Sequence, residues 1–193
     1  MRKIYLFNFL IIILVGFYFS ACNSSQTGST KPSLKDTTAV FPTDSFAFYE
    51  NILVKDSLNN ELRLVLATNY YVEKQFGKAV DHLLTIYRFD EKNLEALITL
   101  GNIYYDTEQN EKAIAFYEKA LLIDNKNVNV RCDMATCYLN LKKTEQALSL
   151  LKKNIEIEYN HAQSHHNLSV IYKELGKSIE AAEEMKIYNK LSK

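Results

Sequence analysis

The sequence lacks an excess of charge of either sign. Its 23 lysine and arginine side chains balance 23 aspartate and glutamate side chains. Removal of residues 1–21 would take away Arg2 and Lys3 and leave 21 basic and 23 acidic side chains, a net charge of −2. A chain so close to neutral has no electrostatic footprint for nucleic acid or for an anionic membrane surface. We therefore expect any partner to be recognised by shape and local chemistry.

Cysteine is also scarce, with three in the chain. Cys132 and Cys137 lie five residues apart in one expected helix, which separates their Cα atoms by roughly 8 to 9 Å and prevents a disulfide. A redox pair or a zinc knuckle would need another spacing and more partners. We interpret both cysteines as small apolar side chains.

The only two prolines fall in a stretch rich in serine, threonine and glycine, from Asn23 to about Thr43. This composition buries too little apolar surface to offset its ordering entropy, so residues 22–43 are predicted to form a flexible tether. A coil of that length reaches about 25 Å on average.

Catalytic motifs are missing as well. The sequence has neither a nucleophile elbow nor a dinucleotide fingerprint. Gly176-Lys177-Ser178 resembles the end of a phosphate-binding loop, but Ile171 stands where that loop needs its first glycine. We therefore expect no enzyme and no cofactor.

The N-terminus begins MRKIYLFNFLIIILVGFYFSAC, with two cations, an apolar run, two small residues and Cys22. This layout is typical of a secretory signal, although the run is almost long enough for a retained membrane anchor. Ser20-Ala21-Cys22 resembles the lipobox of bacterial lipoproteins, with Phe19 at a position where leucine is usual. The resemblance implies cleavage of a signal peptide, residues 1–21, and lipidation (palmitate) of Cys22, which would anchor the chain to a membrane.

From residue 60 onward the chain repeats every 34 residues without insertion or deletion. The invariant columns are Tyr70, Tyr104, Tyr138 and Tyr172, and Ala79, Ala113, Ala147 and Ala181. An apolar residue precedes each tyrosine by four positions and a small residue by three, as Leu100 and Gly101 precede Tyr104. This spacing places a buried stripe on one helix face and lets two helices approach closely.

A 34-residue period with these residue types resembles the tetratricopeptide repeat (TPR), a helix-turn-helix unit. The clearest copy is LEALITLGNIYYDTEQNEKAIAFYEKALLIDN. The resemblance implies an all-α, right-handed α-solenoid of four units in the TPR domain, residues 60–193, and these units are 60–93, 94–127, 128–161 and 162–193. The proline that usually closes a unit is replaced by Glu91, Asn125 and Tyr159, so we expect less sharply defined helix ends.

Residues 44–59 are predicted to form an N-terminal capping helix that begins at Asp44 or Ser45. Its apolar side chains would pack on the first unit, and they are Phe46, Tyr49, Ile52 and Leu53. At the other end Met185, Tyr188 and Leu191 would leave an apolar strip on the last helix, which is a candidate for self-association or partner docking.

By the same resemblance, the first helices of the units line a concave groove that holds a protein or peptide partner. The implied lining residues are Leu64, Thr68, Tyr71, Ile98, Asn102, Tyr105, Cys132, Thr136, Leu139, His166, Val170 and Lys173. A mixed apolar and polar groove suits a helix or an extended segment. TPRs that bind the acidic C-termini of chaperones carry a lysine and, four residues later, an asparagine in this groove. This chain keeps the asparagine, Asn102, but has Ile98 in place of the lysine, so we do not expect it to bind chaperone C-termini.

Three of the four histidines cluster in residues 160–172. His161 and His165 stand four apart and can in principle share a metal ion on one helix face. A zinc protease motif also needs a glutamate beside the first histidine, where this chain has Ala162, and Asn167 is a poor third ligand. We expect solvated or groove-lining histidines and no metal site.

These features favour a membrane-anchored TPR scaffold or adaptor lipoprotein that mediates protein–protein interaction in the bacterial cell envelope, in a periplasmic or outer-membrane location. Two alternatives remain open. The chain is a structural homo-oligomer that associates through its C-terminal helix, or it is a metal-binding protein that uses the histidine cluster.

Overall fold

The computed structural model describes residues 46–193. All of these residues belong to one compact unit. The predicted signal peptide, the lipidation site Cys22, the tether and the two candidate capping residues Asp44 and Ser45 lie outside the described residues.

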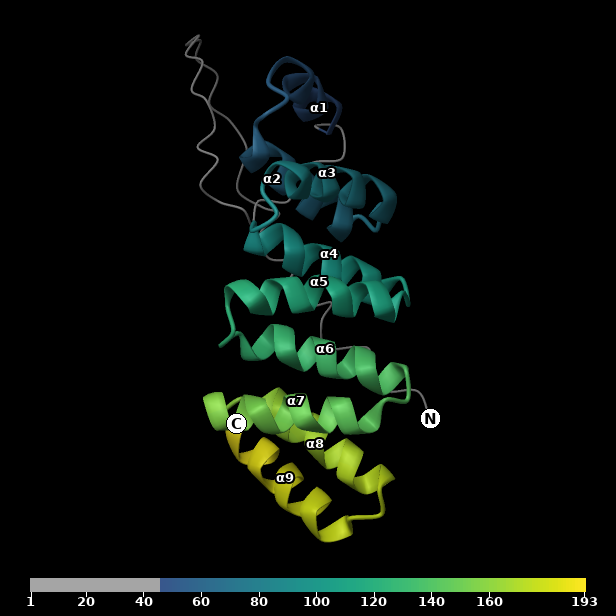
Figure 1. Ribbon diagram of the computed structural model, residues 1–193, viewed down its shortest axis with the longest axis vertical. Coiled ribbons are helices and arrows are strands. Elements are labelled where there is room, and N and C mark those ends of the chain that lie inside the picture. The colour runs from purple at the N-terminus through teal and green to yellow at the C-terminus, as the bar shows by residue number, and fades with distance from the viewer. Residues whose placement is uncertain (1–45) are drawn as a thin grey trace, which may run out of the picture. The chain divides into compact units, whose positions relative to one another are not determined.

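The described part of the chain folds into nine α-helices (Figure 1). A single helix, α1 (Phe46–Lys55), precedes four helix pairs. The pairs are α2 (Asn60–Val72) with α3 (Phe76–Phe89), α4 (Leu94–Asp106) with α5 (Asn110–Ile123), α6 (Val128–Asn140) with α7 (Thr144–Ile157), and α8 (Ala162–Glu174) with α9 (Ser178–Leu191). The prediction of an all-α fold with four helix-turn-helix units behind an N-terminal helix is confirmed.

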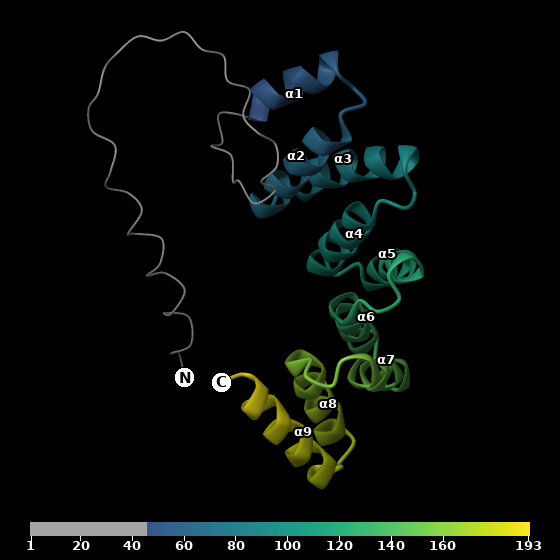
Figure 2. The same cartoon turned by 90° about the vertical axis from the view of Figure 1, so that its left-hand side faces the viewer.

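Each helix pair packs on the next, because a single pair cannot bury its apolar face alone. The first helices of neighbouring units touch, α2 with α4 and α6 with α8. Figure 2 shows α4 and α6 on the inner side of a curved stack and α5 and α7 on its outer side. The repeated apolar columns form the core, in which Leu66, Leu100 and Leu168 are fully buried.

The two helices of a unit approach most closely at the small residues. Ala79, Ala113 and Ala147 of the second helices have no exposed surface. A Cβ atom added to Gly101 of α4 would lie 2.4 Å from Cε1 of Tyr117 in α5. Only glycine therefore fits beside the Tyr117 ring, which is itself 1% exposed.

The helix ends are well defined without the prolines, contrary to our expectation. Asn59, Asn93 and Asn127 stand 34 residues apart, and the side chain of each accepts a hydrogen bond from a backbone N–H three residues later. These N-caps satisfy orphan donors at the start of α2, α4 and α6 and are worth about 1 kcal/mol each. The asparagine N-caps thus define where each of these units begins, in place of the proline that usually closes a TPR unit.

The turn within each unit has a left-handed residue at the same place. Lys74, Glu108 and Lys142 have φ of 57°, 60° and 60°, and Gly176 has φ of 72°. In each turn the following N–H bonds back to a carbonyl near the end of the first helix, as from Gln75 to Tyr70. The sharp reversal holds the paired helices antiparallel.

Helix α1 covers the first unit, as the sequence predicted. Phe46 and Leu53 are 6% and 5% exposed, and Tyr49 and Ile52 pack against the same cluster. The ring of Phe46 stacks on Tyr70 with centroids 4.5 Å apart. Among residues 46–193, none of the helices is both long enough and apolar enough to cross a bilayer.

We predict that Gly101→Ala lowers the free energy of unfolding by about 1 to 3 kcal/mol, because the added methyl group must displace the buried Tyr117 ring. Urea unfolding followed by circular dichroism measures the change. Gly77→Ala in α3 is the matched control, since nothing lies within 4 Å of its added Cβ, and it should be neutral or gain up to about 1 kcal/mol. Equal stability of the two variants would contradict the close approach.

Candidate partner-binding groove

The first helices of the four units, α2, α4, α6 and α8, carry the predicted groove residues. Eleven of the twelve keep part of their side chain accessible to solvent, and Val170 and Lys173 of α8 are the most exposed. Cys132 differs, because it is 3% exposed and packs in the core between the third and fourth units. Burial also raises the pKa of its thiol to about 12, so Cys132 is an inert core side chain.

Polar contacts join the first helices of neighbouring units along this surface. The Tyr71 hydroxyl of α2 donates to Asp106 Oδ2 of α4 at 2.6 Å. The Asn167 amide of α8 lies 3.4 Å from Thr136 Oγ1 of α6. These bonds fix the orientation of Tyr71 and Thr136 relative to the neighbouring first helix.

Two aspartates in the groove were missed by the sequence analysis. Asp106 follows Tyr105, and Asp133 follows Cys132, so each is the neighbour of a position that was singled out. Both are exposed. Asp133 nevertheless lies among enough protein atoms that desolvation raises its pKa to about 6. The column of Asp133 gave no clear signal, because the same position holds buried Val65 in the first unit and half-buried Thr99 in the second.

The charges of both aspartates reach the groove tyrosines. Burial raises the pKa of Tyr71, and the hydrogen bond to Asp106 and the charges of Asp106 and Asp133 raise it further. Burial, Cys137, Asp133 and Asp106 raise the pKa of Tyr105, while Asn140 lowers it by a hydrogen bond. Both carboxylates therefore raise the pKa of both phenols.

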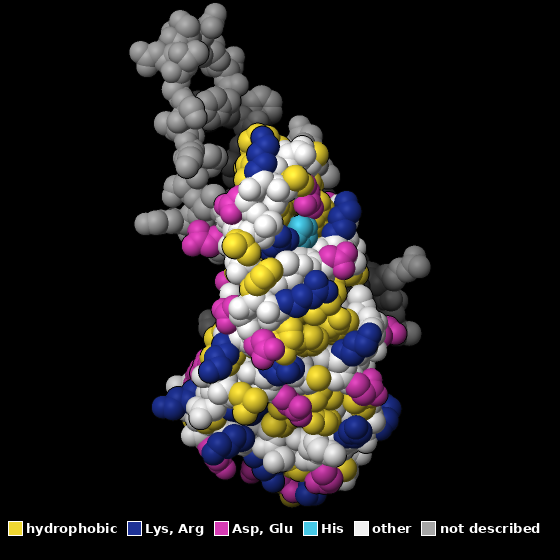
Figure 3. Space-filling model, turned by 45° about the horizontal axis from the view of Figure 1, so that its top comes forward, with side chains coloured by type: hydrophobic (Ala, Val, Ile, Leu, Met, Phe, Trp, Pro, Cys, Tyr) yellow, Lys and Arg dark blue, Asp and Glu magenta, His cyan; other side chains and the backbone are white. Residues whose placement is uncertain are grey.

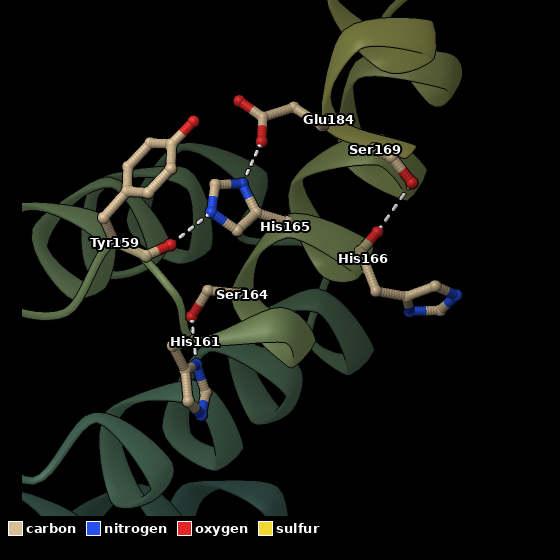
Figure 4. A network of polar contacts seen from close by, with 7 residues as sticks. All are labelled: Tyr159, His161, Ser164, His165, His166, Ser169 and Glu184. Atoms are coloured by element: carbon tan, nitrogen blue, oxygen red, sulfur yellow. Dashed lines mark hydrogen bonds and ion pairs between the residues drawn. The ribbon is translucent and has the colours of Figure 1, made fainter. Parts of the chain in front are cut away.

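The prediction for His165 is wrong, because this side chain is neither solvated nor in the groove. It is fully buried, at the position where Leu97 and Arg131 are buried in earlier units. Figure 4 shows its ring between Glu184 and the carbonyl group of Tyr159. Nδ1 lies 2.5 Å from Glu184 Oε2 and Nε2 lies 2.6 Å from the Tyr159 oxygen.

The two hydrogen-bond partners of His165 determine where its protons lie. The Tyr159 carbonyl oxygen only accepts, so Nε2 carries a proton. The short contact between Nδ1 and Glu184 Oε2 needs a second proton between them. The pair holds both protons and has no net charge, which is the arrangement that a buried site tolerates. It ties α8, α9 and the α7–α8 connection together.

His161 occupies the N-cap position that asparagine holds in the other units. Its ring contacts Ser164 Oγ at 2.7 Å and Asn129 Oδ1 at 2.9 Å. Ser164 also accepts from the fully buried Asn154, which accepts from Arg131. Desolvation lowers the pKa of His161, so a neutral ring protonated on Nε2 fits these partners.

His166, a predicted groove residue, is half-buried, with its ring centroid 5.0 Å from that of Tyr188 in α9. The three histidines therefore do not converge. Within residues 46–193, no group of three or more His, Cys, Asp or Glu side chains is placed to hold a metal ion.

The face shown in Figure 3 carries charged side chains of both signs. Lysine and arginine side chains alternate there with aspartate and glutamate, and apolar patches lie between them. Such interspersed charges favour solubility and offer no field of one sign.

A repeated helix pair, stacked unit on unit, defines a helical-repeat protein of the TPR type. The family model described as "Tetratricopeptide repeat protein 21 forth ARM domain" matches residues 97–193, half of the chain, and the chain belongs to that family. The sequence matched none of the curated proteins.

Solved structures have the same fold. A crystal structure of MamA is 19% identical, with a TM-score of 0.72, and the match covers 77% of this chain and 86% of that one. YrrB, described as a TPR protein with an unusual peptide-binding site, is 22% identical, with a TM-score of 0.66, and the match covers 77% of this chain and 76% of that one.

We predict that His165→Gln destabilises the last unit by about 3 to 5 kcal/mol, because the Glu184 carboxylate, with its side chain 17% exposed, loses its charged partner. Amide hydrogen exchange should show lost protection in α8 and α9 with little change in α2 to α5, since repeat units are coupled mainly to their neighbours. His166→Gln is the control and should stay within about 0.5 kcal/mol of the wild type. Comparable effects of the two variants would argue against the buried pair.

Proposed function

We propose that this protein is a membrane-anchored scaffold lipoprotein of the bacterial cell envelope, which holds a segment of a partner protein in the groove of its TPR stack. No catalytic role is assigned to it. The observation that carries the proposal is the row of partly exposed side chains on the first helices, from Leu64 to Lys173, which only buried Cys132 interrupts.

The chemistry of the groove suits a peptide or a helix better than a small molecule. Its lining combines apolar side chains such as Ile98 and Leu139 with amide, hydroxyl and carboxylate groups that can bind backbone or side-chain partners. The description of YrrB as having a peptide-binding site supports the same use of this fold.

The membrane anchor is supported by the sequence alone, through the apolar N-terminal run and the Ser20-Ala21-Cys22 lipobox. We predict that Cys22→Ala abolishes acylation, because the thiol is the acceptor. Labelling with a palmitate analogue and membrane fractionation measure this. Incorporation of label into the variant at the wild-type level would refute the assignment.

We predict that a photoreactive residue at Val170, which is 39% exposed in the groove, gives a discrete adduct with one partner protein in intact cells. The control position is Leu122 on α5, which is 86% exposed and lies on the other helix of its unit. A groove that binds a partner should give the adduct from Val170 and not from Leu122. Absence of an adduct at Val170, or an identical adduct at both positions, would count against the scaffold proposal.

Self-association through α9 is a second candidate, favoured by one observation. No residue of α9 is buried, and Ile179 is 75% exposed. Sedimentation of the full chain in mild detergent tests it, because a monomeric mass at every concentration would exclude an oligomer.

A further inference from the structure

The helix α1 has two different faces. Its inner face packs on the first unit through Phe46 and Leu53, which are 6% and 5% exposed. Glu50, the only acidic residue of this helix, is bound to the first unit as well. Its Oε1 accepts a hydrogen bond from the Tyr70 hydroxyl at 2.9 Å and lies 3.0 Å from Nε2 of His82. The contacts of the inner face are thus those of a capping helix.

The outer face of α1 is apolar and basic. The exposed residues of this helix include no acidic one, and they are Ala47, Phe48, Asn51, Val54 and Lys55. Phe48 and Val54 are 63% and 81% exposed, and Leu58, three residues after the helix, is 67% exposed. Three of the five most exposed large apolar side chains of residues 46–193 therefore lie in one short segment. Apolar side chains gathered in this way mark a surface that binds a partner or a membrane.

These exposed residues form one continuous strip along α1. Residues three and four apart are neighbours on a helix surface, so Asn51 adjoins the other four. Lys55 places a cation at one end of the strip. The carboxylate that follows it, Asp56, accepts a hydrogen bond from Asn59 at 3.0 Å. An apolar strip that ends in a lysine suits the boundary between the headgroups and the acyl chains of a lipid layer.

The position of α1 in the chain favours a membrane as its partner. Only 23 residues separate Cys22, the proposed acylation site, from Phe46. A coil of that length spans about 27 Å on average, and such a tether would hold α1 beside the membrane at an effective concentration of about 1 mM. Among the described helices α1 is the first after the anchor, and it forms one end of the stack, whereas α9 forms the other (Figure 2).

The strip is too small for a stable contact with a second copy of the chain. A large aromatic side chain buries about 150 to 250 Å², so Phe48, Val54 and Leu58 together fall short of the roughly 800 Å² per partner that a stable protein–protein interface buries. A membrane needs a smaller contact area, because the anchor already keeps the strip close to the lipid surface.

From the composition of the strip and its separation from Cys22, we infer that the outer face of α1, together with Leu58, lies on the surface of the membrane. The apolar side chains enter the boundary between headgroups and acyl chains, by about 5 to 10 Å. The Lys55 stem follows them and its ammonium group stays among the headgroups. The inference rests on the membrane anchor of the proposed function and adds a second contact, which orients the stack with its first unit toward the membrane.

The test uses a tryptophan reporter in the full acylated chain, because the sequence contains no tryptophan. Phe48→Trp places the single indole on the outer face of α1. Leu122→Trp on α5, where Leu122 is 86% exposed, is the matched control. Each chain is inserted by its acyl groups into vesicles of phosphatidylcholine and phosphatidylglycerol, with or without bromine on the lipid acyl chains. Bromine quenches an indole only at short range, so Phe48→Trp should lose most of its fluorescence and Leu122→Trp should keep its own.

A second pair of variants tests the strip itself in the Phe48→Trp chain. Val54→Glu with Leu58→Glu should abolish the quenching, because charged side chains are costly to move out of water. The amount of protein on the vesicles should not change, since the acyl chains hold it there. Leu122→Glu with Phe89→Glu is the control, which adds the same charge at exposed apolar positions, and it should keep the quenching.

The outcomes separate the inference from the proposed function. A wild-type chain that is found neither on the vesicles nor in the membrane fraction of cells would overturn the anchor and the inference together. With the chain anchored, the inference alone is overturned by an unquenched Phe48→Trp, by equal quenching of Leu122→Trp, or by quenching that persists with Val54→Glu and Leu58→Glu.

Two further results would also overturn it. Emission of Phe48→Trp that shifts to shorter wavelength as the protein density rises, without quenching by bromine, would show that a second copy covers α1. A lower melting temperature of the chain with Val54→Glu and Leu58→Glu than of the control pair would show that these side chains serve the fold.

Discussion

The whole stack depends on the close approach of the two helices within each unit. At that contact in the second unit, Gly101 of the first helix faces the large Tyr117 side chain of the second helix. The Tyr117 ring fills the core, and its hydroxyl reaches through to donate to Asn102 at 2.8 Å. One side chain therefore couples the packing of a unit to the position of a groove residue.

The fold could be predicted because every core contact recurs at the same spacing. A column of tyrosines or alanines that keeps its period of 34 residues through four units has few explanations other than stacked helix pairs. The asparagine caps at Asn59, Asn93 and Asn127 were equally periodic, yet their role emerged only from the hydrogen bonds to the following turn.

Site residues were harder to predict because a single repeat position tolerates several solutions. The position of His165 holds Leu97 in one unit and Arg131 in another, and all three are buried. Leucine needs no partner there, arginine finds Asn154, and histidine finds Glu184 from α9. The sequence shows the polar substitution but not the distant residue that compensates for it. Cys132, where half-buried Leu64 and Ile98 stand in other units, is buried, and its sulfur accepts a contact from Asn167 of the next unit.

The contacts of this stack are almost all local in sequence. Each helix touches the one before it and the one after it, and the longest regular contacts join first helices of adjacent units. Folding rates rise as the mean sequence separation of contacts falls. A chain of this kind can fold progressively from one end as it becomes available, because no early segment waits for a distant one to complete its core. Its topology thus suits a protein that emerges through a narrow passage and must acquire structure on the way out.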